Sequence, residues 1–154
     1  MKNLILALLF SASVTANDSI VFTKYQDKMT DRVYYMTNRD LIIANSTKTE
    51  GAKFQYVYDS NELIVTLVGL GGCNENNTII ILFENGLKQT LESWNKFDCE
   101  NSYFKIEDDE LLRKYEMQTI RVTNGYSFES VTVDIPKRNK RYFIQLYKSL
   151  DNIK

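Results

Sequence analysis

The sequence predicts a mainly β protein, an antiparallel sandwich or partly closed barrel with a short helix and a C-terminal amphipathic helix as cover. Two observations lead to this fold class. Short apolar or β-branched runs alternate with turn-forming residues along most of the chain, which is typical of strands joined as hairpins. The chain then ends in an apolar stripe at helical spacing, which indicates a helix packed on the sheet.

Turn-forming residues locate the hairpins. Asn85-Gly86 and Asn124-Gly125 each separate two such runs, and Asn-Gly favours a two-residue type I′ turn because both central residues need positive φ. A third turn is expected at Asp59-Ser60-Asn61, whose small polar side chains bond their own backbone. The strands are therefore expected at 20–24, 32–37, 41–45, 53–58, 63–68, 78–84, 87–91, 119–123 and 126–135.

Two helices complete the expected fold. Four acids at 107–110 precede Leu111 and Leu112, and acids in a first turn suit the helix dipole. The second helix follows Pro136, and its apolar stripe is expected to pack on the core. The stripe consists of Tyr142, Phe143, Leu146, Tyr147, Leu150 and Ile153.

Residues 1–16 are expected to be a cleaved secretory signal peptide, and residues 17–154 a single β-rich domain. Lys2 supplies the positive n-region, Leu4–Phe10 the apolar h-region, and Ala16 precedes the expected cut. The alternative is a membrane anchor, but the apolar run is far shorter than the roughly 20 residues that span a bilayer. The protein is thus expected to be secreted or periplasmic, without a transmembrane segment after cleavage.

The expected export determines the redox state that we predict for the two cysteines. In an oxidising compartment Cys73 and Cys99 are expected to form a disulfide, which would bring the loops around them together. The alternative is a cytosolic protein with two free thiols.

Composition excludes several classes of function. With 19 Lys+Arg against 20 Asp+Glu, the chain lacks the net positive charge that nucleic-acid binding usually needs. The absence of histidine excludes Ser-His-Asp and Cys-His nucleophile systems, and two cysteines are too few for a four-thiolate zinc site. We therefore expect neither a metal site nor a cofactor.

A basic run lies where the C-terminal helix is expected to begin, and it consists of Lys137, Arg138, Lys140 and Arg141. Positive charge at a helix N-terminus opposes the helix dipole. The run would therefore pair with the acids at 107–110, bind an anion alongside the free helix amides, or remain a solvated face.

Two further segments hold candidate contacts with a partner. Gly69–Asn77 lacks the lysine of a phosphate-binding loop and is expected to be a long loop, in which Asn74 and Glu75 could contact a partner. Trp94 would either pack against the disulfide or form an exposed aromatic hot spot.

Asp27 and Asp31 lie four residues apart in the segment DKMTD. One interpretation makes them carboxylate partners for acid–base chemistry or calcium, although the spacing does not match an EF-hand loop. The other is a polar turn after the first strand, because Asp and Thr favour turns.

The segment Asp27–Asp31 and the strand end Leu82–Gly86 (LFENG) resemble small exported bacterial and phage proteins, including the periplasmic VasI-like proteins associated with type VI secretion. Other segments resemble short secreted bacterial proteins: Cys73–Asn77, Ser93–Phe97, Ile120–Gly125 and Tyr142–Ile144. The resemblance implies export and a small β-rich domain, and it brings no catalytic residues. Glu84 departs from the VasI-like pattern, which has Asp there.

Together these features predict an exported, non-enzymatic binding or interaction domain whose partner is an unknown protein or an anionic ligand. An inhibitor or immunity-type protein is the alternative, because both are rigid surfaces. A small carboxylate-based glycan hydrolase is a weaker alternative, whose acids would come from Asp27, Asp31, Glu75 and Asp134.

Overall fold

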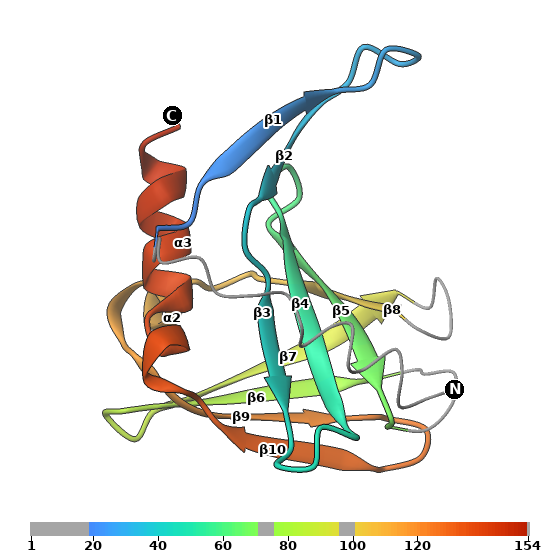
Figure 1. The fold of residues 1–154 in the computed structure, drawn as a ribbon, viewed down its shortest axis with the longest axis vertical. Helices are drawn as coiled ribbons and strands as arrows, with labels where there is room; N and C mark the ends of the chain where they lie inside the picture. Colours follow the sequence, from blue (N-terminus) through green and yellow to red (C-terminus); the bar gives the residue numbers. More distant parts are fainter. Residues whose placement is uncertain (1–18, 71–75, 96–100, 154) are drawn as a thin grey trace.

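The computed structural model describes residues 19–70, 76–95 and 101–153, which form an antiparallel sheet covered by helices (Figure 1). The predicted mainly β class is confirmed. The strands are β1 (Phe22–Gln26), β2 (Val33–Thr37), β3 (Leu41–Ala44), β4 (Gly51–Val57), β5 (Glu62–Val68), β6 (Thr78–Phe83), β7 (Lys88–Asn95), β8 (Asn101–Lys105), β9 (Met117–Thr123) and β10 (Ser130–Asp134). The helices are α2 (Glu110–Lys114), the 3-10 turn η1 (Lys137–Asn139) and α3 (Tyr142–Asp151).

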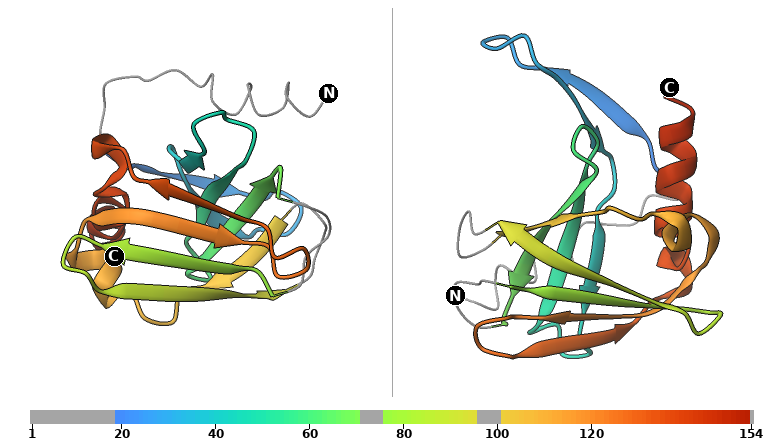
Figure 2. Two further views of the ribbon diagram at one scale, coloured as in Figure 1. Left: turned by 90° about the horizontal axis from the view of Figure 1, so that it is seen from below. Right: turned by 180° about the vertical axis from the view of Figure 1, so that it is seen from behind.

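The strands follow one path, β1-β2-β4-β5-β8-β7-β6-β9-β10, and β3 pairs with β4. The strands β3 to β5 run across the direction of β6, β9 and β10, so the sheet bends into two layers (Figures 1 and 2). β3 lies against β10, but within the described residues no ladder joins them. The architecture is therefore a sandwich or partly open barrel, as the turn pattern predicts.

The core lies between the two layers and under α3. In β6, Ile79, Ile81 and Phe83 are buried, while the alternate residues on the other face are half-buried. The strand is central, between β7 and β9, and its outer face is only partly covered. The predicted helical stripe is buried from Tyr142 to Leu150, which confirms its packing on the core.

Both Asn-Gly turns differ from the two-residue prediction. The chain between β6 and β7 forms a three-residue turn in which Gly86 alone has positive φ (82°). Between β9 and β10 the loop spans 124–129, and its positive φ belongs to Phe128 (60°) instead of Gly125. The third turn is confirmed: Asn61, in the left-handed region (φ 53°), joins β4 to β5.

The sequence did not predict β8. Residues 101–105 pair with β5 through partners such as Leu63↔Phe104, about forty residues apart in sequence. The N-terminal hairpin of β1 and β2 projects away from the rest of the sheet (Figure 1). Most of β1 is exposed, so this hairpin contributes little to the core.

Candidate functional site

The loop between β9 and β10, which we call the aromatic loop (Asn124–Glu129), exposes two aromatic side chains. Tyr126 is 75% exposed and Phe128 is 81% exposed. Aromatic side chains of this size usually bury most of their surface, and exposed ones are enriched at the centres of protein interfaces. The aromatic loop is therefore the first candidate for a contact surface.

Two buried asparagines hold the aromatic loop. The Asn124 side-chain oxygen accepts the backbone N–H of Tyr126 (2.8 Å) and of Ser127 (3.2 Å), and its amide donates to the carbonyl of Leu70. The Asn77 side-chain oxygen accepts the N–H of Gly125 (3.0 Å). These bonds connect the loop to a different part of the chain, so its shape is set by tertiary contacts.

Phe128 adopts backbone geometry that bulky residues avoid. Its φ of 60° lies in the left-handed region, which costs a non-glycine residue about 1 kcal/mol or more. Its N–H donates to the Asn124 carbonyl (2.9 Å), which holds it there. Strain of this kind persists only where surrounding bonds impose it, and it is concentrated at binding sites.

A groove of about 600 Å³ runs along β7 and forms a second candidate site. β7 and β8 are register partners only at Ser93↔Phe104 and Asn95↔Tyr103. Toward Lys88, β7 stays beside β6, whereas β8 ends at Lys105, one residue past Phe104, which leaves a gap between β7 and the segment that leads to α2. The groove lies in this gap, and its lining includes Thr90, Glu92, Trp94, Lys105, Glu107 and Leu111.

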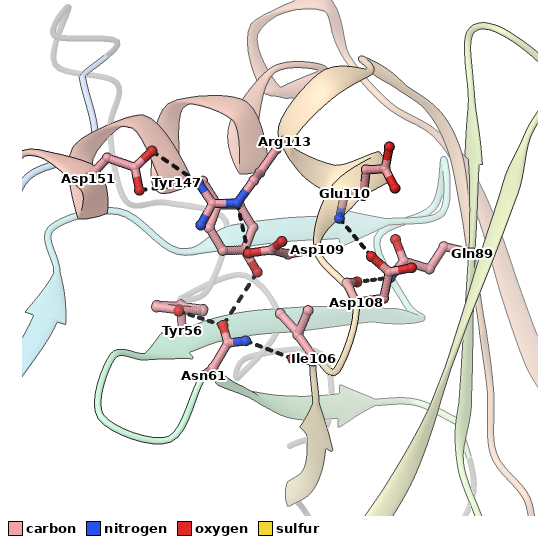
Figure 3. A network of polar contacts seen from close by, with 10 residues as sticks. All are labelled: Tyr56, Asn61, Gln89, Ile106, Asp108, Asp109, Glu110, Arg113, Tyr147 and Asp151. Atoms are coloured by element: carbon pink, nitrogen blue, oxygen red, sulfur yellow. Dashed lines mark hydrogen bonds and ion pairs between the residues drawn. The ribbon is translucent and has the colours of Figure 1, made fainter.

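A polar network fixes the wall of the groove opposite β7 (Figure 3). The Asn61 amide donates to the carbonyl of Ile106 (2.7 Å), and its side-chain oxygen accepts the Tyr56 hydroxyl (2.7 Å). Burial raises the pKa of Tyr56, which keeps this hydroxyl protonated as a donor. The segment after β8 is thereby attached to the turn between β4 and β5.

An ion-pair cluster attaches α2 to α3 in the same network. Arg113 lies 2.8 Å from Asp109 and 3.0 Å from Asp151, and its guanidinium stacks over the Tyr147 ring at 4.4 Å (Figure 3). Burial opposes the charge of Arg113, but the hydrogen bonds to the two carboxylates outweigh it and raise its pKa. These contacts connect α2, and with it the groove wall, to α3.

Gln89 joins the two walls at the floor of the groove. Its amide nitrogen donates to the carbonyl of Asp108 (2.5 Å), which orients the side chain. Its oxygen Oε1 is buried and has no hydrogen-bond partner among the residues that the structure describes. A buried acceptor without a donor costs about 1–3 kcal/mol, so a ligand that brings an N–H or O–H group would relieve this cost.

The predicted basic run lies before α3 instead of inside its first turn. Lys137 and Arg138 are exposed on η1, Lys140 is half-buried, and Arg141 lies 3.5 Å from Glu116. The acids of α2 pair with its own Arg113 and Lys114. Pairing between the basic run and the 107–110 acids is therefore not observed in the described structure.

The remaining predicted residues fall into two groups. Trp94 is 58% exposed and lines the groove. Cys73, Asn74, Glu75 and Cys99 lie outside the described residues, and the disulfide stays a prediction. The described residues that flank the loops of Cys73 and Cys99 meet at Asn77. Its side-chain amide donates to the Ser102 hydroxyl, and its backbone carbonyl accepts the N–H of Ser93.

Trp94 and the basic run are not brought together. In β6, Thr78 pairs with Thr123 of β9 on one side and with Glu92 of β7 on the other. Because the aromatic loop follows Thr123 and Trp94 follows Glu92 by two residues, the two lie at the same end of that layer. The basic run follows Asp134, whose partner Thr119 lies beside Leu82 at the opposite end.

Two of the described carboxylates of the hydrolase alternative, Asp27 and Asp134, are hydrogen-bonded within the fold. Asp27 accepts the N–H of Met29 and the hydroxyl of Thr30, both at 2.8 Å, and these bonds lower its pKa. Asp134 accepts the Thr119 hydroxyl (2.9 Å). The turn interpretation of Asp27 therefore fits its contacts, and a lowered pKa is the opposite of what a general acid needs. The described residues hold no cluster of three or more metal-ligating side chains.

Comparison of the chain with protein-family models, curated proteins and solved structures gives no match. None of the helices in the described part of the chain combines the length and the apolar character that a bilayer crossing requires.

Sequence reasoning missed the aromatic loop and most of the groove. Tyr126 and Phe128 follow an Asn-Gly signal and alternate with polar residues, which predicts a strand there. The pattern Tyr-Ser-Phe-Glu directly after Asn-Gly was the one available signal, but it fits a strand equally well.

Proposed function

We propose that the protein is an exported, non-enzymatic interaction domain that contacts a protein partner through the aromatic loop. The observation that carries the proposal is the exposure of Tyr126 and Phe128 on a loop held by two buried asparagines. A loop fixed before binding loses little conformational entropy on association, which favours affinity.

The charge around the loop favours a protein pocket as the binding surface. Glu129 is the only charged side chain of the aromatic loop, and no lysine or arginine lies within it. An anionic membrane surface attracts basic segments, so an acidic loop suits it poorly. Two protruding aromatics instead suit an apolar pocket on a partner protein, where Phe and Tyr bury large areas.

An inhibitor or immunity-type role is the second candidate, and the two exposed aromatic side chains on a hydrogen-bonded loop support it. Such a protein would insert the loop into the cleft of the enzyme that it blocks. The activity of the captured partner distinguishes the two roles: an inhibitor lowers it, and an adaptor leaves it unchanged.

The test uses immobilised mature protein, residues 17–154, to capture proteins from the medium or envelope of the source cells. We expect one discrete partner, and Phe128→Ala and Tyr126→Ala should each reduce its capture at least about tenfold, as interface hot spots do. Leu87→Ala is the matched control, because Leu87 is an exposed apolar residue (48%) of the turn at the far end of the same layer.

Equal capture by the Phe128→Ala variant and by wild type would contradict the proposed surface. Turnover of substrate in a broad hydrolase screen, abolished by a carboxylate substitution, would contradict the non-enzymatic role. Sequencing of the exported protein's N-terminus tests the cut after Ala16 and, with it, the predicted secreted or periplasmic location.

A further inference from the structure

The groove along β7 contains a free strand edge. Over Lys88–Glu92, β7 pairs with β6 on one side, and no other described strand pairs with its second edge. Such an edge presents a row of backbone donors and acceptors at fixed spacing. An added extended chain can satisfy this row with its own backbone.

The hydrogen-bond alternation of β7 shows which groups face the groove. The N–H of Ser93 donates toward β6, to the carbonyl of Asn77, and the N–H of Phe83 donates to the carbonyl of Leu87. Residues 87, 89, 91 and 93 therefore direct their backbone groups to β6, because strand residues alternate between edges. The backbone N–H and C=O groups of Lys88, Thr90 and Glu92 point to the opposite edge, where the groove lies.

The side chains of the groove complement an extended peptide. Trp94 supplies a flat apolar surface, and Gln89 Oε1 supplies a buried acceptor that an N–H group would satisfy. Charges of both signs line the walls, with Lys88 and Glu92 on β7 and Lys105 and Glu107 opposite. No ion pair among the described residues uses Lys88, Glu92 or Lys105.

We propose that the groove binds an extended peptide segment of a partner protein, which adds as a strand to the free edge of β7 beside Thr90 and places an apolar side chain on Trp94. This inference rests on the proposed binding role but concerns a surface separate from the aromatic loop. The free strand edge favours a peptide over a glycan, because a glycan has no backbone N–H and C=O groups at the spacing of a strand.

The test selects phage-displayed random decapeptides on the immobilised mature protein, with hexa-N-acetylglucosamine as the glycan probe. We expect enriched peptides with an aromatic or aliphatic residue at a constant position, and binding about tenfold weaker to Trp94→Ala. No enrichment over Trp94→Ala, or binding of the glycan alone, would overturn the proposal.

A matched pair of variants distinguishes strand addition from side-chain contact. Thr90→Pro removes the one N–H that faces the groove at this position, and proline is tolerated on an edge strand when its N side faces away from the ladder. Thr90→Val keeps the N–H and the side-chain shape. We expect binding about tenfold weaker to Thr90→Pro and nearly unchanged for Thr90→Val, and equal binding by both would overturn strand addition.

Hydrogen exchange in the wild type answers the same question even where Thr90→Pro does not fold. A bound strand should slow exchange of the Thr90 and Glu92 amides at least about tenfold, while the Gln89 and Leu91 amides, which face β6, change little. Unchanged exchange at Thr90 in the peptide complex would overturn the proposal. If the Phe128→Ala variant still binds the selected peptides while the wild type captures no partner protein, the result would contradict the proposed function of the aromatic loop and leave peptide binding in the groove supported.

Discussion

The two Asn-Gly turns of this protein have the same dipeptide and different structures. At Asn85-Gly86 the asparagine side chain is exposed and accepts the N–H of Leu87 (3.0 Å), two residues away, and the turn has three residues. At Asn124-Gly125 the asparagine is buried and bonds Leu70, more than fifty residues away, and the loop has six residues. The length and conformation of these two turns therefore depend on which residues the asparagine side chain hydrogen-bonds. The dipeptide predicts a turn better when those residues are its sequence neighbours.

The largest expected effect is the loss of Asn124. Asn124→Ala leaves the buried Leu70 carbonyl and two half-buried loop N–H groups without their side-chain partner, which should lower the free energy of unfolding by about 2–4 kcal/mol. Asn85→Ala is the matched control and should cost under about 1 kcal/mol, because water replaces its single exposed bond. Urea unfolding measures both, and equal losses would contradict the comparison.

Backbone strain should give effects of opposite sign in the two turns. Phe128→Gly relieves a left-handed phenylalanine and should stabilise the fold by up to about 1 kcal/mol, while it weakens partner capture. Gly86→Ala should destabilise by about 1 kcal/mol through φ alone, because nothing lies within 4 Å of an added Cβ. Thermal unfolding measures both changes. A destabilised Phe128→Gly would indicate that the ring packs favourably despite its exposure.

The smallest effect concerns Asp27, whose bonds are local like those of Asn85 but whose side chain is charged. Its hydrogen bonds to Met29 and then Thr30 place its pKa below the ordinary 3.8. Because the pKa of Asp27 is lower in the folded protein, its ionised side chain stabilises the fold above the unfolded pKa. This stabilisation is lost as pH falls through the folded pKa. An NMR titration should give a midpoint below 3.8 and a coincident shift of the Met29 amide, both absent in Asp27→Asn. A midpoint at or above 3.8 would contradict the turn.

The sequence predicted the strands whose partners are neighbours in the chain. β4 with β5, β6 with β7 and β9 with β10 are local pairs, and in each the flanking residues indicate both strands and the position of the turn, although not the length of the two Asn-Gly turns. β8 is short, and its main partner β5 is distant, so nothing near Asn101–Lys105 identified it. The helical stripe was recognised because its spacing is a local property of α3.

The candidate sites were less predictable for the same reason. Trp94 is predictable as a candidate because it is the one tryptophan of the chain and lies near a cysteine, but its groove depends on how β7 separates from β8. The conformation that exposes Phe128 depends on the bonds of Asn77 to Gly125 and of Asn124 to Leu70. These bonds join residues about fifty positions apart, so the sequence around Phe128 does not predict them.

The position of β8 also bears on the order of folding. The hairpins β4–β5, β6–β7 and β9–β10 close short loops and can form early, because short-range contacts cost little chain entropy. Among the described strands, the pairing path between the two halves of the sheet runs through β8, whose pairing with β5 spans about forty residues. We therefore expect docking of β8 onto β5 to be the slow step, so that Val65 and Ser102, partners in that ladder, become ordered after the hairpins that they connect.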